Sequence, residues 1–126
     1  MTAQLEHVNY TVHDSRKTAA FLCSLFGWET RWQGEAINGG HTVHVGTKES
    51  YVAVFSPKAP APSEEDHYVT IGGLNHIAVT VDDIDDMEKR VADMGFVPVN
   101  HANYEPGRRF YFHDDDGIEY EVVQYD

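Results

Sequence analysis

The sequence contains a single cysteine, Cys23, among its 126 residues, so it cannot form a disulfide within the chain. Cys23 lies in an apolar helical pattern, which favours a buried structural thiol over a nucleophile. Basic residues are also scarce, with 9 Lys and Arg against 21 Asp and Glu and a net charge of −12. This charge opposes nucleic acid and anionic membranes as partners. We therefore expect the partner to be a small molecule.

Long hydrophobic runs are absent as well. Runs such as Tyr51–Phe55 fall far short of the ~20 apolar residues that a transmembrane helix needs, and no basic segment followed by an apolar one opens the chain. The composition, 41% hydrophobic and 24% charged, is typical of a globular domain, and the length suits one domain of ordinary size. We expect a cytoplasmic protein that does not bind membranes.

The chain contains an internal repeat. The segment GLNHIAVTVDD at residues 73–83 is similar to QLEHVNYTVHD at residues 4–14, and a shift of 69 residues aligns them. Both segments alternate apolar and polar residues, which is typical of a β-strand. We infer two copies of one structural unit. The aligned pairs are Leu5 with Leu74, His7 with His76, Val8 with Ile77, Thr11 with Thr80, Val12 with Val81 and Asp14 with Asp83.

A helix is predicted after the strand in each copy. Asp14 precedes SRKTAAFLCSLFG, and Asp82 or Asp83 stands at the start of DIDDMEKRVADMG. Aspartate at these places is suited to capping a helix, and Gly27 and Gly95 follow where a left-handed cap is favoured. Each helix has one apolar stripe. The stripes consist of Thr18, Phe21, Leu22 and Leu25 in the first helix and Ile84, Met87, Val91 and Met94 in the second.

Three strands are predicted after each helix. They are expected at WETRWQ, HTVHVGT and SYVAVFS in the first copy and at FVPVNH, RRFYFHD and GIEYEVVQY in the second. Each copy therefore consists of a strand, a helix and three strands, and the fold class is α+β. The predicted modules span residues 1–57 and 74–126, with a connector rich in proline and charge over residues 58–73. Together they form one domain.

The later strands of the two copies align at a shift of 67 residues. This shift pairs His44 with Tyr111 and Val54 with Glu121. If a pseudo-two-fold axis relates the copies, equivalent residues surround one centre and the two repeated histidines face each other. The inward side of the first strands is polar, which does not suit a dry core. We therefore expect a curved mixed sheet that encloses a cup.

Two histidines and a carboxylate predict a metal site in this cup. A lone histidine on a strand is more often a core residue, but two at symmetric positions, His7 and His76, favour metal ligands. Glu121 lies on a strand whose alternation puts it on the inner face, and a buried carboxylate needs a cation or a strong hydrogen-bond donor. Two imidazoles and one carboxylate are a known ligand set for iron and its neighbours.

The same residues carry a family resemblance. LEHVNYTVHD and LNHIAVTVDD, each at the start of a module, and FYFHDDDGIEYE near the end are similar to motifs of the vicinal oxygen chelate superfamily. This family includes glyoxalase I, methylmalonyl-CoA epimerase, fosfomycin-resistance proteins, extradiol dioxygenases and bleomycin-sequestering proteins, and its architecture is paired βαβββ modules. The closing motif departs from the family pattern at Asp115, where proline is usual, and at Ile118, where asparagine is common. Both changes affect a turn.

The resemblance implies that His7, His76 and Glu121 bind a divalent metal ion, which would be Fe, Zn, Mn or Ni. Glyoxalase I and the epimerase have a fourth ligand, Glu or Gln, on the last strand of the first module. Here the matching position is Val54, or Ala53 if the register slips by one, and neither binds metal. The implied three-ligand site is therefore similar to those of fosfomycin-resistance proteins and extradiol dioxygenases.

The resemblance also places Tyr111 in the pocket as a catalytic candidate. The acid–base histidine of the dioxygenases has no counterpart, because its place falls near Tyr51. His44 is the candidate base, since an imidazole with an ordinary pKa of ~6.5 suits proton transfer near neutrality; the alternative is a partly exposed strand histidine. Arg108 and Arg109, expected in a loop, are either solvated or available to hold a carboxylate or phosphonate. The histidines expected at the surface are His13, His41, His67, His101 and His113.

Three functions remain open from the sequence. The first is a metal-dependent enzyme similar to lactoylglutathione lyase, with isomerase, lyase or addition chemistry on a substrate that chelates the metal through vicinal oxygens. The second is an iron-dependent ring-cleaving dioxygenase. The third is a metal-free small-molecule binding protein of the bleomycin-resistance kind. The resemblance also implies a homodimer, in which modules pair either within one chain or across two.

Overall fold

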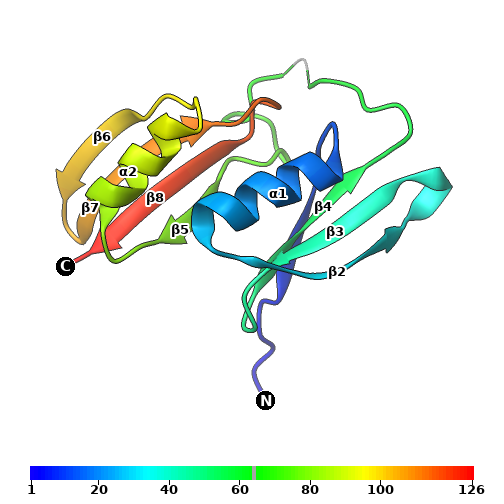
Figure 1. Cartoon of the computed structure of the whole chain (residues 1–126), viewed down its shortest axis with the longest axis horizontal. Helices are drawn as coiled ribbons and strands as arrows, with labels where there is room; N and C mark the ends of the chain where they lie inside the picture. Colours follow the sequence, from blue (N-terminus) through cyan, green and yellow to red (C-terminus); the bar gives the residue numbers. More distant parts are fainter. Residues whose placement is uncertain (64) are drawn as a thin grey trace. The chain divides into compact units, whose positions relative to one another are not determined.

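The first βαβββ module is formed by residues 7–56. In the computed structural model, which describes residues 1–63 and 65–126, this module belongs to a unit that ends at residue 63 (Figure 1). Its elements are β1 (His7–Thr11), α1 (Ser15–Phe26), β2 (Glu29–Glu35), the short 3-10 helix η1 (Ile37–Gly39), β3 (His41–Gly46) and β4 (Tyr51–Ser56). The strands lie in the order β1-β4-β3-β2, with β1 parallel to β4 and the other pairs antiparallel.

The second module has the same order of elements, in the unit formed by residues 64–126. Its elements are β5 (Ile77–Thr80), α2 (Ile84–Asp93), β6 (Val99–Tyr104), β7 (Gly107–His113) and β8 (Glu119–Tyr125). The strand order is β5-β8-β7-β6, with β5 parallel to β8. The two predicted βαβββ modules are confirmed, and each keeps its own four-stranded mixed sheet. The connector expected over residues 58–73 includes residue 64, which lies outside the described residues.

Helix α1 begins and ends where the capping pattern predicts. The side chain of Asp14 accepts hydrogen bonds from the backbone N–H groups of Arg16 at 3.0 Å and Lys17 at 3.3 Å. These donors would otherwise have no partner in the first helical turn. Gly27 follows the helix with a φ of 73°, and its N–H bonds the carbonyl of Cys23. The thiol of Cys23 is half-buried, so the expectation of a buried thiol is met only in part.

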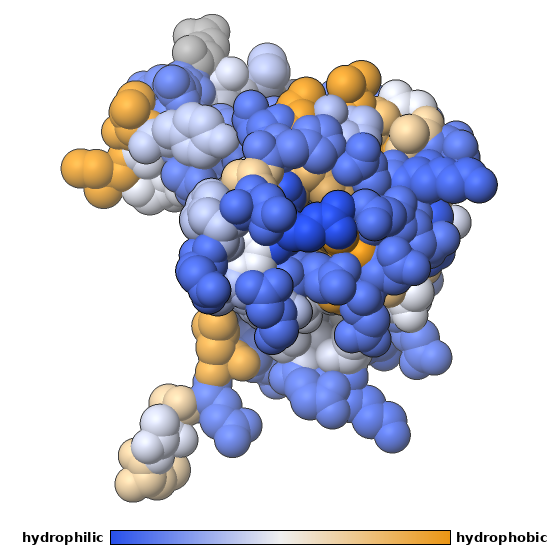
Figure 2. Space-filling model, turned by 90° about the vertical axis from the view of Figure 1, so that its left-hand side faces the viewer, coloured by the Kyte–Doolittle hydropathy of each residue, from blue (hydrophilic) through white to orange (hydrophobic). Residues whose placement is uncertain are grey.

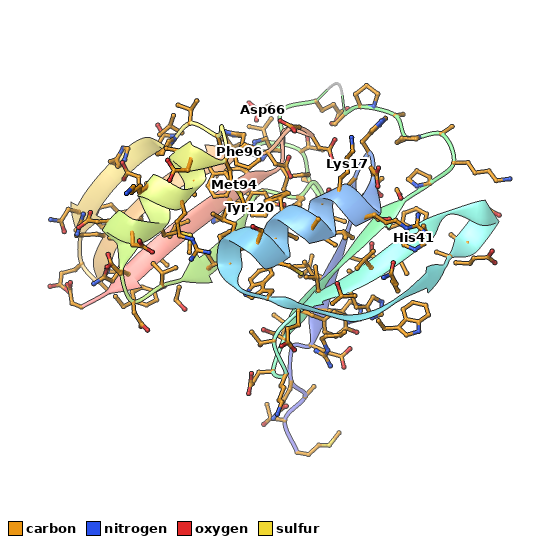
Figure 3. The ribbon with its side chains drawn as sticks, viewed as in Figure 1. Lys17, His41, Asp66, Met94, Phe96 and Tyr120 are labelled. Atoms are coloured by element: carbon orange, nitrogen blue, oxygen red, sulfur yellow. The ribbon has the colours of Figure 1, made fainter. Side chains whose placement is uncertain are left out.

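Helix α2 is capped by the second of its two candidate aspartates. The Asp83 side chain accepts a hydrogen bond from the backbone N–H of Asp86 at 3.0 Å. The helix ends at Asp93, so Met94 lies beyond the last turn and is 38% exposed instead of completing the apolar stripe (Figure 3). The buried residues of α2 are Ile84, Met87 and Val91. Among the residues that the structure describes, no helix is long and apolar enough to cross a membrane.

Each sheet has one face covered by the helix of its own module and one polar face. Figure 1 shows α1 lying over β3 and β4 and α2 lying over β7 and β8. Because successive residues of a strand point to opposite faces, apolar and polar residues separate between the two sides. The largest fully buried side chains are Leu22, Leu25, Val43, Val45 and Val54 in the first module and Val91, Phe110, Phe112, Tyr120 and Val122 in the second.

The strand register places Ala53, and not Val54, at the position equivalent to Glu121. Ala53 pairs with His44, and Glu121 pairs with Tyr111, the residue equivalent to His44. Val54 points to the other face, where α1 packs, and has no exposed surface. The one-residue error arises because four residues join β3 to β4 and five residues join β7 to β8, which changes the shift between the copies from 67 to 68.

The turn between β7 and β8 is organised by Asp114. Its Oδ1 accepts hydrogen bonds from the backbone N–H groups of Asp116 and Ile118, both at 2.9 Å, and its Oδ2 accepts one from the Tyr120 hydroxyl at 3.2 Å. Burial raises the pKa of Asp114 to about 6. The two departures from the family motif, Asp115 and Ile118, both lie in this turn, as expected.

The surface on the side of β6 and α2 is mostly hydrophilic. Figure 2 shows this face, on which apolar residues are scattered among hydrophilic ones. Among the large apolar side chains that the second unit exposes are Val97 and Tyr104. Scattered apolar residues are usual on protein surfaces, so they need no functional explanation here.

Candidate metal site

His7, the first residue of β1, has one ring nitrogen fixed by a neighbouring carboxylate. Its Nδ1 lies 2.9 Å from Oε1 of Glu6. A carboxylate oxygen only accepts, so Nδ1 carries the proton and Nε2 keeps its lone pair. Glu6 also accepts a hydrogen bond from the Tyr51 hydroxyl at 3.0 Å, and the hydrogen bonds from His7 and Tyr51 lower the pKa of Glu6. Metal-binding histidines commonly have their second nitrogen fixed in this way.

His44 lies beside His7 on the polar face of the first sheet. The ring of Tyr51 stacks on both histidines, with centroid distances of 4.9 Å to His7 and 4.8 Å to His44. The Arg31 guanidinium lies 4.2 Å from the centroid of the Tyr51 ring. Burial lowers the pKa of His44, and the charges of His7 and Arg31 lower it further. The neutral imidazole of His44 is therefore favoured near neutrality and can accept a proton.

His76 has the equivalent arrangement in the second module. Its Nδ1 lies 2.6 Å from Oδ1 of Asn75, which occupies the position of Glu6 in the repeat. The amide oxygen accepts, so Nδ1 carries the proton and Nε2 keeps its lone pair. This Nε2 faces Oε1 of Glu121 at 3.1 Å. Two lone pairs at this distance repel each other unless a proton or a cation lies between them.

The donor atoms of His76 and Glu121 therefore fit a divalent metal ion. Two ligand atoms that bind one ion at a right angle, with bonds of ~2.1 Å, are ~3.0 Å apart. The observed separation of 3.1 Å between Nε2 and Oε1 agrees with this value. The arrangement supplies one nitrogen and one oxygen ligand from the second module.

Glu121 lies on β8, between β5 and β7, and only 7% of the residue is exposed. Its Oε2 accepts hydrogen bonds from Nη1 of Arg109 at 2.9 Å and from the Tyr111 hydroxyl at 3.2 Å. Burial raises the pKa of Tyr111, and the charge of Glu121 raises it further, so the phenol stays protonated and donates. Tyr111 and Glu121 are cross-strand partners, which explains why their side chains meet on one face.

Arg109 belongs to this site, although the sequence left a solvated loop as an alternative. It lies in β7, and its side chain is 14% exposed. The guanidinium lies 4.7 Å from the centroid of the Tyr104 ring, and its Nε and Nη2 are buried without a hydrogen-bond partner among the described residues. The neighbouring Arg108 is exposed and pairs with Asp85 at 2.7 Å. Arg109 therefore has donors left over for an anionic group.

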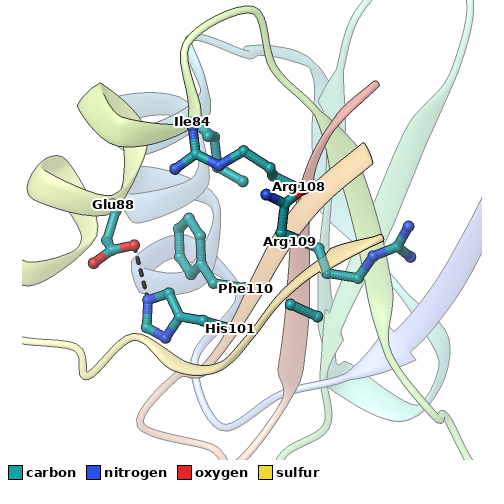
Figure 4. A pocket seen from close by; sticks show the side chains of 8 residues that line it. Ile84, Glu88, His101, Arg108, Arg109 and Phe110 are labelled. Carbon is teal, nitrogen blue, oxygen red and sulfur yellow. Dashed lines mark hydrogen bonds and ion pairs between the residues drawn. The ribbon is translucent and has the colours of Figure 1, made fainter. Parts of the chain in front are cut away.

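A pocket of about 290 Å³ lies between α2 and the strands β6 and β7. Figure 4 shows that the guanidinium of Arg109 points away from this pocket, while His101 bonds Glu88 on its wall at 2.9 Å. The pocket lies on the helix side of the sheet. It therefore does not contain the predicted metal ligands of the second module.

The structure brings the predicted site residues together in two groups. His7 and His44 lie together in the first unit, and His76, Tyr111 and Glu121 lie together in the second. The binding of one ion by ligands from both groups stays a prediction.

Sequence reasoning missed the residues that orient the ligands. Glu6 and Asn75 precede the two histidines at equivalent positions of the repeat, and both offer an oxygen acceptor. This shared property was a usable signal, because metal-binding histidines need a partner for their second nitrogen.

The chain belongs to the Glyoxalase/Bleomycin resistance protein/Dioxygenase superfamily, whose family model matches residues 4–122. This is the vicinal oxygen chelate superfamily that the sequence motifs resemble. The search of curated proteins returned no match. Family membership is thereby established for nearly the whole chain.

Solved structures share the fold at low sequence identity. A glyoxylase/bleomycin resistance protein/dioxygenase domain from Frankia sp. EAN1pec is 18% identical, with a TM-score of 0.82, and the match covers 100% of this chain and 94% of that one. FosX, a fosfomycin resistance protein from Listeria monocytogenes complexed with Mn(II) and sulfate, is 22% identical, with a TM-score of 0.77 and coverage of 100% and 95%. TnmS3, an antibiotic binding protein from Streptomyces sp. CB03234, is 19% identical, with a TM-score of 0.73 and coverage of 99% and 98%.

The same FosX has also been solved, as a mutant, with Mn(II) and 1S,2S-dihydroxypropylphosphonic acid. At these identities the likenesses show the fold alone.

Proposed function

We propose that this chain is a metal-dependent enzyme that acts on a small substrate with two vicinal oxygens. In this proposal His7, His76 and Glu121 bind one divalent ion, which is Fe, Zn, Mn or Ni. The observation that carries the proposal is the shared state of the two histidines: the preceding residue holds Nδ1 in each, and Nε2 keeps its lone pair. Membership of the superfamily and the buried carboxylate of Glu121 support it further.

The surrounding residues have distinct roles in this proposal. The bound ion would supply Lewis acidity toward the two substrate oxygens. His44 takes a proton from the substrate, because its lowered pKa favours the neutral imidazole and its ring lies beside that of His7. Tyr111 orients the carboxylate of Glu121 through its hydroxyl. The reaction would be an isomerisation, a lyase reaction or an addition.

The proposed substrate carries an anionic group in addition to its vicinal oxygens. Nε and Nη2 of Arg109 are buried without a partner, and a guanidinium binds carboxylate or phosphonate oxygens through two such donors. The solved complexes of Listeria FosX hold sulfate in one case and a dihydroxypropylphosphonic acid in the other. Both ligands present anionic oxygens, so a vicinal diol with a phosphonate is the first ligand to test.

Ligand binding to the protein with and without Mn(II) tests this function. We would load chelator-treated protein with Mn(II) and follow water proton relaxation while adding 1,2-dihydroxypropylphosphonate, a hemithioacetal of methylglyoxal and glutathione, or catechol. A ligand that displaces water from the ion lowers the relaxation enhancement. The proposal expects one of the first two ligands to do so, and to bind the metal-free protein much more weakly. Tight binding that is independent of Mn(II) would contradict it.

A metal-free binding protein is the second candidate, and one observation favours it. The Arg109 guanidinium already neutralises the carboxylate of Glu121, so the site does not require an ion for charge balance. TnmS3, which shares the fold, is an antibiotic binding protein. The Mn(II) experiment separates the two candidates. The dioxygenase is less well supported, because Tyr51 occupies the place near which its acid–base histidine would fall and donates its hydroxyl hydrogen to Glu6.

Replacing His44 with glutamine is expected to lower kcat by about 10²–10⁴-fold without loss of metal, since it removes the proposed general base and no ligand. The measurement is steady-state kinetics with a substrate found in the ligand experiment, together with metal analysis. His101→Gln is the matched control, because His101 is exposed and pairs only with the surface residue Glu88 among its itemised contacts with acids. Unchanged kcat in His44→Gln would remove the residue from the proposal.

We also expect a homodimer at micromolar concentration, as the family resemblance implies. Sedimentation equilibrium measures the mass directly. A stable monomer would contradict this expectation, and it would also exclude a site whose histidines come from two different chains.

A further inference from the structure

We propose a second divalent-metal site in this protein, formed by His67, His113 and Glu119. All three residues belong to the second unit, and one ligand atom from each lies within 4.8 Å of the other two. Two imidazoles and one carboxylate suit Zn²⁺ and similar transition ions. The inference does not depend on the proposed function, because none of these residues binds the ion at Glu121.

The carboxylate of Glu119 lacks a permanent positive partner. Its side chain is 2% exposed, and its ion-pair contacts are with Nε2 of His113 at 3.1 Å and Nε2 of His67 at 3.9 Å. The Tyr68 hydroxyl donates to the same carboxylate, and this hydrogen bond raises the pKa of Tyr68 to about 12, so the phenol stays neutral. A buried carboxylate among neutral groups is unfavourable. A divalent ion between the three side chains would supply the missing charge.

Two of the three ligands are held by the sheet. His113 and Glu119 are directly opposite each other on β7 and β8, so both side chains project from one face. The distance of 3.1 Å between their ligand atoms matches the ~3.0–3.4 Å expected for two ligands of one zinc ion with bonds of ~2.1 Å. The side chain of His113 is 44% exposed, which leaves a path from solvent for the ion.

The third ligand comes from a turn that is fixed to the sheet. The backbone N–H of Tyr68 donates to Oδ1 of Asp66 at 2.9 Å, and the Thr70 hydroxyl donates to the Asp66 carbonyl at 2.7 Å. Figure 3 shows Asp66 close to the end of β7. Tyr68 reaches from this turn to Glu119, and this contact places the neighbouring His67 over the carboxylate. Nε2 of His67 has to move by roughly 0.5 Å to complete the site.

The second ion would be separate from the ion proposed at Glu121. Glu119 and Glu121 are two residues apart on β8, which places them ~7 Å apart along the strand, whereas two ions that act together in catalysis are ~3.5–4 Å apart. His67 is the only proposed ligand outside β7 and β8. The ion would therefore tie the turn at residues 66–70 to the sheet.

Zinc stoichiometry of the full chain tests the proposal. Chelator-treated wild type, His67→Gln, His113→Gln and Glu121→Gln would be titrated with Zn²⁺ in equilibrium dialysis, with bound zinc counted by atomic emission. Wild type is expected to bind one ion more than His67→Gln or His113→Gln, while Glu121→Gln keeps the ion at the second site. Circular dichroism checks folding, and the exposed ring of His113 makes that variant the safer of the two.

The outcomes separate the two sites. His101→Gln is the matched control: His101 pairs with Glu88 at 2.9 Å but belongs to no three-ligand cluster in the part of the chain that the structure describes, so its zinc binding should equal that of wild type. If His67→Gln and His113→Gln also bind as much zinc as wild type, with equal affinity, the second site is refuted. If they lose the ion that Glu121→Gln retains, the second site stands, whatever becomes of the proposed function.

Tyr68→Phe adds a test of positioning. The phenol hydrogen-bonds the proposed carboxylate ligand, and removing such a group typically weakens metal binding by about 10–100-fold without removing a ligand. We expect unchanged zinc stoichiometry with a higher Kd for the second ion. An unchanged Kd would contradict the assigned role of Tyr68.

Discussion

Val54→Glu is expected to destabilise the first module by on the order of 4 kcal/mol, with or without metal. Val54 has no exposed surface and lies on the face of β4 that packs against α1. A carboxylate there would be surrounded by apolar side chains and would have no cation to pair with. Added metal should not restore the stability, because this face of the sheet is opposite to the face that carries His7 and His44.

Ala53→Glu is expected to behave differently, although the changed residue is the next one along the strand. Ala53 pairs with His44 and is equivalent to Glu121, so a glutamate would point toward the proposed ion and supply a fourth ligand. We expect lower stability without metal, recovery with metal, and an increase in metal affinity of about 10-fold or more. Activity should fall, since the new ligand occupies a coordination position that the substrate needs.

Melting temperatures of wild type and both variants, with chelator and with added Mn(II) or Zn²⁺, measure the contrast. The account requires a metal-dependent recovery in Ala53→Glu and none in Val54→Glu. Equal destabilisation of both variants under all conditions, with no extra metal bound by Ala53→Glu, would show that the metal site is wrongly placed.

Arg109→Met is expected to lower the melting temperature of the metal-free protein by at least ~5 °C and that of the metal-loaded protein much less. Arg109 pairs with the buried carboxylate of Glu121 at 2.9 Å, so its removal leaves a negative charge without a permanent positive partner. A bound ion would restore the charge balance. The loss of the guanidinium should also raise KM for an anionic substrate.

Arg108→Met is the matched control for this variant. Arg108 is the neighbour of Arg109 on β7, but its side chain is exposed and pairs with the exposed Asp85, and exposed ion pairs contribute little to stability. Its melting temperature should stay close to that of wild type. If metal does not reduce the destabilisation of Arg109→Met, then the ion does not bind next to Glu121.

The local features of the fold were predictable from the sequence because short-range chemistry determines them. Asp14 and Asp83 cap the helices through backbone groups two or three residues away, and Gly27 adopts the left-handed conformation that ends α1. Met94 was assigned wrongly because a periodic pattern does not show where a helix ends. The internal repeat then extended these local predictions to the architecture of both modules.

The strand register was harder to predict because it depends on turn length. The alignment of His44 with Tyr111 carried its shift of 67 across a turn that is one residue longer in the second module, and it therefore paired Val54 with Glu121 in place of Ala53. A shift of one residue moves a side chain to the opposite face of the sheet. The identity of the position was therefore sensitive to a single inserted residue.

Contacts between distant segments could not be predicted from the sequence. Arg109 was expected in a loop, and its contact with Glu121 follows only from the extension of β7 back to Gly107. His67 was expected at the surface, but Tyr68 fixes its turn to a carboxylate that is 51 residues away in the chain. Such contacts depend on the tertiary fold and have no local sequence signal.

Counting the metal bound by single-ligand variants tests the central claim most directly. In a His67→Gln background, which removes the proposed second site, Mn(II) binding would be measured for the parent and for His7→Gln, His76→Gln and Glu121→Gln. The account predicts one ion per chain in the parent and a large loss of affinity in each of the three variants. Unchanged affinity in His7→Gln, with loss in the other two, would contradict the claim that both modules supply ligands to one ion.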